Sequence, residues 1–179
     1  MNLFIKPHAG RYFSMEAMQK IKCLTIEDSN FPDRLRKLSG MPKKLYYIGN
    51  LPDPTKPAAA VVGARMCSPY GRCQAFKYAR TMASYGVQII SGMARGIDAE
   101  GHKGALDTDT PTFAVLGSGV DVCYPNSNRG LYQRILEKGG GIISERPSGS
   151  PPVNWAFPAR NRIISGLSDA VLVVEAKEQ

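Results

Sequence analysis

The pattern of apolar and polar positions changes character near residue 57. Upstream of this point the apolar positions follow no sustained period, and three prolines between residues 49 and 57 are typical of a linker or a surface loop. We therefore expect a short lead-in region, residues 1–56, and one larger domain, residues 57–179. Within the lead-in the sequence fits only short elements: a helix over 13–24, a turn into a second helix over 31–35, and a strand over 45–48.

Downstream of residue 57, short apolar runs alternate with amphipathic segments. The apolar runs are typical of strands buried on both faces, and the amphipathic segments are typical of helices that cover a sheet. Alternation at this spacing predicts an α/β fold with a mostly parallel sheet, right-handed crossovers and helices on both faces. The expected strands are 58–62, 87–90, 113–116, 142–143 and 170–174, and the expected helices are 70–85, 97–106, 128–138 and 160–167.

Composition bears on where the protein resides, on the state of its cysteines and on the charge of its partners. No apolar stretch approaches the roughly 18 residues of a membrane helix, and the N-terminus lacks the apolar region of a secretory signal, so we expect a cytoplasmic protein. The four cysteines lie apart without a CxxC pair, which predicts free, mostly buried thiols and no metal site. The net charge of +8 favours a polyanionic partner such as DNA or RNA, and its weight depends on where the arginines fall.

Ligands of an open parallel sheet bind outside the carboxyl ends of its strands. Three of the five predicted strand ends carry glycines, and two of these also carry an arginine. Glycine lets backbone amides approach phosphate oxygens, although it also serves simply to make a tight turn. Because three such ends occur together, we favour anion binding. The candidates are Gly63 and Arg65, then Ser91, Gly92 and Arg95, then Gly117 and Gly119.

The sequence offers little for cofactor binding or catalysis. Neither a GxGxxG fingerprint after the first strand nor a Walker A lysine motif is present, so we expect no nucleotide cofactor. The only histidines are His8 and His102, and we expect His102 to be a partly exposed helical residue. Carboxylates at strand ends suit acid–base work, but we favour a role in capping helices and orienting arginines. These carboxylates are Asp98, Asp121, Glu145 and Glu175.

The segment 155–162 combines aromatic and basic side chains immediately before a predicted helix. Guanidinium groups bind phosphates in a bidentate manner, and aromatic rings stack on unpaired bases. The alternative is that an aromatic side chain fills the core beneath a loop, which we expect for one of Trp155 and Phe157. The candidates for nucleic-acid binding in this segment are Phe157, Arg160, Asn161 and Arg162.

Taken in order, these blocks resemble the DprA/Smf (DNA-processing) family over residues 57–179, about two-thirds of the chain. The resemblance implies a Rossmann-like, doubly wound domain that binds single-stranded DNA and loads the RecA recombinase in natural transformation, without catalysis and commonly as a homodimer. It also implies that Arg65, Phe157 and the arginines after Phe157 contact DNA. The matching blocks are 62–65 (VGAR), 91–98 (SGMARGID), 114–121 (AVLGSGVD), 157–168 (FPARNRIISGLS) and 173–176 (VVEA).

Two further expectations follow from the comparison with that family. Its members usually continue beyond the VVEA strand with another helix and strand, whereas this chain ends at Gln179, so we expect a C-terminally truncated domain whose strand 170–174 is poorly covered. The alternative function is a nucleotide N-glycosidase of the lysine-decarboxylase-like group, with Glu145 or Asp121 acting on a nucleoside monophosphate. That group carries a Pro-Gly-Gly-x-Gly-Thr block, which is absent here.

Overall fold

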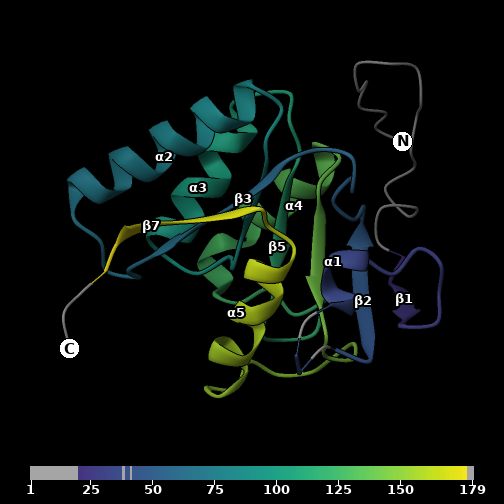
Figure 1. The fold of residues 1–179 in the computed structure, drawn as a ribbon. Coiled ribbons are helices and arrows are strands. Elements are labelled where there is room, and N and C mark those ends of the chain that lie inside the picture. The colour runs from purple at the N-terminus through teal and green to yellow at the C-terminus, as the bar shows by residue number, and fades with distance from the viewer. Residues whose placement is uncertain (1–19, 38, 41, 177–179) are drawn as a thin grey trace, which may run out of the picture.

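The structure, a computed structural model, describes residues 20–37, 39–40 and 42–176. In this part of the chain seven strands form one sheet in the spatial order β1-β2-β6-β5-β4-β3-β7 (Figure 1). None of the helices described is long and apolar enough to cross a bilayer. The strands are β1 (Lys22–Thr25), β2 (Lys44–Gly49), β3 (Ala58–Gly63), β4 (Gln88–Ser91), β5 (Thr112–Val115), β6 (Gly141–Ser144) and β7 (Ala170–Glu175). The helices are α1 (Asp33–Arg36), α2 (Pro69–Ser84), α3 (Ile97–Leu106), α4 (Arg129–Glu137) and α5 (Ala156–Gly166), and a 3₁₀ turn, Asn126–Asn128, precedes α4.

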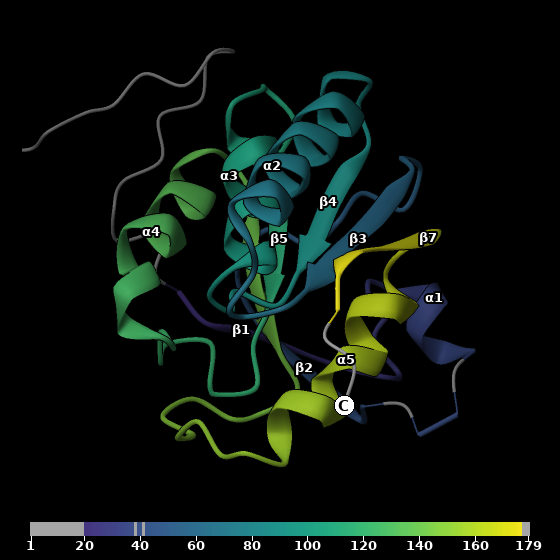
Figure 2. The same cartoon turned by 90° about the vertical axis from the view of Figure 1, so that its left-hand side faces the viewer.

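The strands from β6 to β7 run parallel, and their carboxyl ends therefore meet at one edge of the sheet. At the other side the lead-in region extends the same sheet, because β2 pairs antiparallel with β6 and β1 pairs antiparallel with β2. Helices α2, α3 and α4 lie on one face of the sheet, and α1 and α5 lie on the other (Figure 2). The predicted α/β fold with a mostly parallel, two-sided sheet is confirmed.

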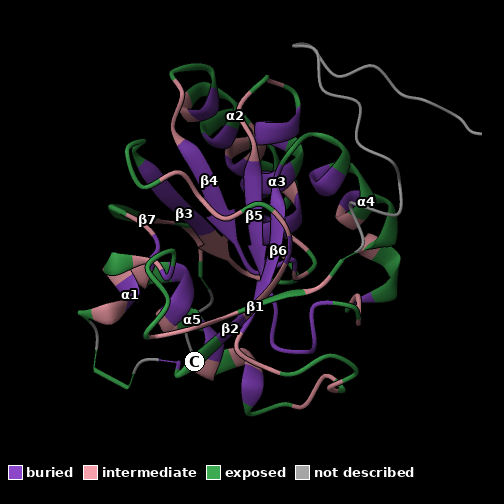
Figure 3. Cartoon of the chain, turned by 90° about the vertical axis from the view of Figure 1, so that its right-hand side faces the viewer, coloured by how far each residue is buried: buried purple, intermediate pink, exposed green. Residues whose placement is uncertain are grey.

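Successive side chains of a strand point to opposite faces of the sheet, and this alternation decides which helices each side chain packs against. In β3, Ala58 and Ala60 pack with Ile163 of α5, whereas Ala59 and Val61 pack against α2 and α3. Because both faces are covered, the central strands are buried along almost their whole length (Figure 3). The faces of the sheet are therefore closed to ligands, whereas the carboxyl ends of the strands are still accessible to them.

Two expected helices differ from the structure. Residues 22–25 form β1 instead of the end of a helix over 13–24, because Leu24 pairs with Leu45 of the antiparallel strand β2; residues 13–19 lie outside the described part of the chain. Helix α5 begins at Ala156, four residues earlier than expected. Pro158 lies in its first turn, where a proline is tolerated because the missing N–H has no partner within the helix.

One edge of the sheet exposes apolar side chains. Strand β7 pairs with β3 alone in the described part of the chain, and Val171 and Val173 are 50% and 57% exposed. The expectation that this strand is poorly covered is confirmed. The four thiols are free as expected, but the expectation that most are buried is wrong. Cys23 and Cys73 are exposed, and Cys67 and Cys123 are half-buried.

Candidate functional site

A basic pocket of about 590 Å³ lies at the carboxyl ends of β3 and β4, beside α2 and α3. Among the described residues that line it, Glu100 alone is acidic, and its Oε1 accepts a hydrogen bond of 2.8 Å from Lys103. Within the described residues, no carboxylate forms an ion pair with the three arginines of the pocket. The pocket therefore carries a surplus of positive charge that favours an anion. Its basic side chains are those of Arg65, Arg72, Arg95 and Lys103.

The basic side chains of the pocket come from four segments. Arg65 follows β3 and Arg95 follows β4, so both arginines that the sequence placed at strand ends line the same cavity. Sequence reasoning missed Arg72 and Lys103. The position of Arg72 in the first turn of α2, close behind the end of β3, was a usable signal. Lys103 lies two turns into α3, and nothing in the sequence indicated that it faces this pocket.

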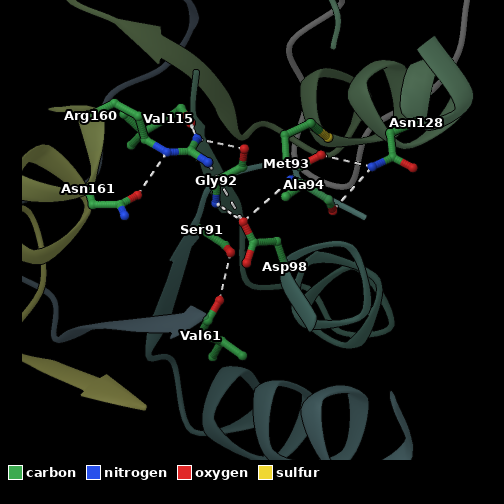
Figure 4. Close-up of polar contacts among 10 residues, drawn as sticks. All are labelled: Val61, Ser91, Gly92, Met93, Ala94, Asp98, Val115, Asn128, Arg160 and Asn161. Carbon is green, nitrogen blue, oxygen red and sulfur yellow. Dashed lines mark hydrogen bonds and ion pairs between the residues drawn. The ribbon is translucent and has the colours of Figure 1, made fainter. Parts of the chain in front are cut away.

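The loop between β4 and α3 is fixed by internal polar contacts, shown in Figure 4. The Asp98 carboxylate accepts hydrogen bonds from the backbone amides of Gly92 and Ala94, at 3.1 and 3.4 Å. The Asn128 amide donates to the carbonyl of Met93 at 2.8 Å, and Met93 itself has a left-handed φ of 62°. Burial raises the pKa of Asp98, although Arg160 and the loop amides oppose this effect. The loop is thus shaped from within and presents Arg95 to the pocket.

Two predicted anion ligands at the end of β4 are turned into the protein. Ser91 is fully buried, and its hydroxyl donates to the Val61 carbonyl at 2.6 Å. The Gly92 amide already donates to Asp98. The expectation that Ser91 and Gly92 contact an anion directly is therefore corrected, because the donors that would do so are used to hold β4 against β3 and to shape the loop.

Arg160 is also an internal residue, although it belongs to the arginine-rich segment. The residue is 5% exposed, and its Nη1 donates to the carbonyls of Gly92, at 2.6 Å, and Val115. Its Nη2 lies 3.9 Å from the Asp98 carboxylate, and its Nε donates to Asn161 at 3.1 Å. This placement corrects the expectation that Arg160 contacts phosphates. The guanidinium instead joins the carboxyl ends of β4 and β5 and lies beside the buried carboxylate of Asp98.

The remaining predicted glycines serve close packing. A Cβ on Gly63 would lie 2.7 Å from the Glu175 carbonyl, and a Cβ on Gly117 would lie 2.9 Å from the Phe157 ring. The Gly119 amide donates to the Ser150 carbonyl at 2.9 Å. These contacts agree with the simpler alternative weighed above, in which the glycines make room for tight turns.

Aromatic and basic groups from distant segments meet beside the basic pocket. The ring of Phe157, at the start of α5, is half-buried and stacks on Tyr124 with a centroid separation of 5.4 Å. The Arg65 guanidinium lies 5.3 Å from the centroid of the same ring. Phe157 is absent from the core clusters, and Trp155 is 67% exposed, so the expectation that one of these two rings fills the core is wrong. Sequence reasoning assigned Tyr124 no role at the site.

Comparison with known proteins gives this arrangement a context. Residues 22–179 match the family model described as DNA recombination-mediator protein A. The chain belongs to this family. It is 42% identical over 157 residues to Protein Smf of Synechocystis sp., covering 86% of this chain and 39% of that protein. It is 39% identical over 173 residues to DNA processing protein DprA of Streptococcus pneumoniae, covering 93% of this chain and 61% of that one. The chain thus spans roughly two-fifths to three-fifths of these relatives.

Solved structures of DprA/Smf members share the fold. The X-ray structure of DNA processing protein A from Streptococcus pneumoniae superposes with a TM-score of 0.82 at 38% identity, covering 92% of this chain and 57% of that one. The Helicobacter pylori protein superposes with a TM-score of 0.78 at 30% identity, covering 89% of this chain and 71% of that one. The latter structure was described for its single-stranded DNA binding mode.

The strand-end carboxylates of this DprA/Smf member are engaged within the protein. Glu145 forms an ion pair with Arg162. Burial alone would raise the pKa of Asp121, but hydrogen bonds from the Gly149 amide and the Ser148 hydroxyl outweigh it and lower the pKa. Both carboxylates thus have partners within the protein itself. The contacts therefore agree with the expectation that these carboxylates orient arginines and loops.

Glu175 has the same kind of role at the end of β7. Its carboxylate accepts hydrogen bonds from the Ser68 amide, at 2.9 Å, and from the Ser68 hydroxyl, at 2.6 Å. Ser68 is the N-cap of α2, and its hydroxyl in turn accepts from the Gly71 amide. The positive end of this helix therefore interacts with a carboxylate of the protein itself.

The expectation that His102 is partly exposed is wrong. The ring is fully buried under the sheet, and its Nδ1 lies 2.8 Å from the Thr112 hydroxyl. Because that hydroxyl donates its proton to the Ile89 carbonyl, Nδ1–H is the donor to Thr112 and Nε2 carries no proton. Burial, assisted by the nearby charge of Arg160, lowers the pKa of His102 to about 3. His102 is thus a neutral core residue without access to the pocket.

Proposed function

We propose that this chain binds single-stranded DNA along the carboxyl edge of its parallel strands. The observation that carries the proposal is the basic pocket with three arginines unpaired within the described residues, directly beside the Phe157 ring. Phosphates bind to the pocket, and an unpaired base stacks at Phe157. The fold match to a Helicobacter pylori relative described for binding single-stranded DNA supports the same conclusion.

The contact between Arg65 and Phe157 supports a preference for single strands. Arg65 lines the pocket and also lies over the ring, so a phosphate held by the guanidinium brings the adjoining base next to an aromatic surface. In a duplex the bases are paired and stacked on one another, and they cannot reach such a ring without unpairing. A strand with free bases makes both contacts.

Binding to oligo-dT and to duplex of equal length, measured across salt concentrations, tests the proposal. We expect tighter binding of oligo-dT and a steep fall with salt, because phosphate contacts release counterions. Arg65→Ala should weaken binding and lower the salt slope by about one unit. Arg80→Ala is the matched control, since Arg80 is exposed on α2 and pairs with Asp107 outside the pocket. Equal affinity for duplex, or a flat salt response, would remove the proposal.

The stacking contact makes a separate prediction. Phe157→Ala should cost roughly 1–3 kcal/mol of oligo-dT binding and leave the salt slope unchanged, because stacking releases no counterions. Tyr78→Ala, which removes a ring that is 47% exposed on α2, serves as the control. A Phe157→Ala variant that melts like the parent and binds with equal affinity would show that the ring is only structural.

We further propose that the bound strand is passed to the RecA recombinase and that the protein acts as a dimer. The family description as a recombination mediator supports this role, and the exposed valines of β7 provide apolar surface for association. At limiting RecA, the chain should stimulate the DNA-dependent ATPase of RecA on oligo-dT, and Arg65→Ala should remove the stimulation. Sedimentation of the purified chain measures whether it forms a dimer. Inhibition by the parent chain, or an unchanged rate, would refute the RecA role.

We also propose that the site binds DNA without catalysis. The intramolecular contacts of Glu145 and Asp121 support this view over the N-glycosidase alternative. Incubation with nucleoside monophosphates should release no free base. Base release that is abolished by Glu145→Gln would establish the enzyme instead.

A further inference from the structure

A second cavity lies on the other side of Phe157. It has a volume of about 320 Å³ and is formed by the ends of β5 and β6 and the start of α5. Gly117, Arg146 and Trp155 are among its lining residues. Like the basic pocket, it opens at the carboxyl edge of the sheet.

The second cavity contains more hydrogen-bond donors than acceptors. Of the described residues that line it, three contribute guanidinium groups, Arg146, Arg160 and Arg162, and one, Glu145, contributes a carboxylate. Glu145 pairs with Nη2 of Arg162. Within the described part of the chain, Nη1 of Arg162 and Nε of Arg146 are buried N–H groups without a hydrogen-bond partner. A buried donor without an acceptor costs about 1–3 kcal/mol, and an anionic acceptor in the cavity would remove that cost.

An exposed indole stands at the rim of the same cavity. Trp155 precedes the first residue of α5, is 67% exposed, and belongs to none of the core clusters. The Arg146 guanidinium lies 4.9 Å from the centroid of the indole, a cation–π distance that holds the two groups together. A large aromatic surface left in water beside an arginine provides the two contacts that a nucleotide needs, one for the base and one for the phosphate.

The start of α5 connects the two cavities. Phe157 follows Trp155 by two residues, and its ring contacts both Arg65 of the basic pocket and the backbone at Gly117 of the second cavity. A strand that leaves the basic pocket past Phe157 therefore reaches Trp155 next.

We propose that the second cavity is a further nucleotide subsite for the same single strand, in which an unpaired base stacks on Trp155 and its phosphate binds Arg146. This inference rests on the proposed function and adds the path that the strand takes. Short oligonucleotides occupy the basic pocket alone, and longer ones extend past Phe157 to the indole.

The chain has one tryptophan, so its fluorescence reports on this cavity directly. We expect longer oligo-dT to quench Trp155, and dTMP or the shortest binding oligo-dT to leave it unchanged. Trp155→Ala should weaken binding of long oligo-dT roughly 5- to 150-fold, the equivalent of one stacked base, and leave short oligo-dT unaffected. Trp155→Phe should retain most of the affinity. Tyr85→Ala removes a ring that is 82% exposed at the end of α2 and should change nothing.

A substitution that removes the charge of Arg146 tests whether this residue binds a phosphate. Arg146→Gln should lower the salt slope for long oligo-dT by about one unit and leave the slope for short oligo-dT unchanged. The variant should melt like the parent, since the side chain forms no ion pair within the described residues.

The outcomes separate this inference from the proposed function. If the parent binds oligo-dT but Trp155→Ala binds long oligo-dT with parental affinity, the subsite is refuted and the proposed function stands, whether or not the fluorescence changes. If dTMP quenches Trp155 as strongly as long oligo-dT does, the cavity takes a free nucleotide and the strand path is refuted. If the parent binds no single-stranded DNA, both proposals fail.

Discussion

Replacement of Arg160 by methionine tests whether this arginine holds the fold or the DNA. Methionine keeps a long flexible side chain and removes the charge, the two hydrogen bonds to the carbonyls of Gly92 and Val115, and the partner of Asp98. Arg160 is 5% exposed, so solvent cannot replace these contacts. Removing one member of a buried charge pair costs about 3–5 kcal/mol, because the other charge stays buried without compensation.

This loss is large against the 5–15 kcal/mol that stabilises an ordinary domain. At roughly 2–4 °C per kcal/mol for a chain of this size, the melting temperature should fall by about 6–20 °C. Urea unfolding followed by circular dichroism gives the free energy of unfolding. A second variant, Arg160→Met with Asp98→Asn, should recover part of the loss, since the uncompensated carboxylate is gone.

The salt dependence of DNA binding decides between the two roles. At a temperature where the folded Arg160→Met protein predominates, its salt slope for oligo-dT should equal that of the parent, unlike the slope of Arg65→Ala. A loss of stability below about 1 kcal/mol, together with a slope lowered by one unit, would refute our account. Arg160 would then be a phosphate ligand, as the sequence suggested.

Three further predictions concern the fold around the site. The pKa of His102 is about 3 in the folded protein, against about 6.5 in an unfolded chain, so only the unfolded state binds a proton at pH values between the two. The free energy of unfolding should therefore fall by roughly 1.4 kcal/mol per pH unit from pH 6 to pH 4. His102→Gln should flatten this slope in acid titrations followed by circular dichroism. Gly92→Ala should destabilise the fold in urea unfolding, because its Cβ would clash with the Arg160 guanidinium; an unchanged midpoint would contradict the close packing. Val171→Thr with Val173→Thr should reduce self-association in sedimentation without lowering the melting temperature, since both side chains are about half exposed; unchanged association would remove β7 as its cause.

The sequence predicted the parallel sheet well because buried strands leave a plain signal. A run such as residues 58–62 is apolar throughout, and every strand of this kind is found. Strand ends are also readable, and Arg65 and Arg95, which the sequence places at strand ends, line one pocket. These features depend on residues close together in the chain, and local patterns therefore indicate them.

The direction in which a helical side chain points was not readable. Arg160 and Arg162 are two positions apart on α5, yet only the packing of α5 on the sheet decides that Arg160 is 5% exposed whereas the Arg162 side chain is 34% exposed and pairs with Glu145. His102 is buried for a similar reason, because it lies on the side of α3 that packs on β5. The same packing exposes Trp155 beside Arg146, a contact between segments nine residues apart.

The contacts of Arg160 have a kinetic consequence for DNA binding. Through its hydrogen bond to the Gly92 carbonyl and its proximity to Asp98, Arg160 connects the loop that presents Arg95 to the helix that carries Phe157. The groups proposed to meet the strand are therefore already in place before it arrives, and binding requires little ordering of the protein. Association should accordingly proceed in a single bimolecular step, at a rate set by electrostatic attraction between the strand and the basic pocket and slowed by salt, without a later step in which the protein rearranges.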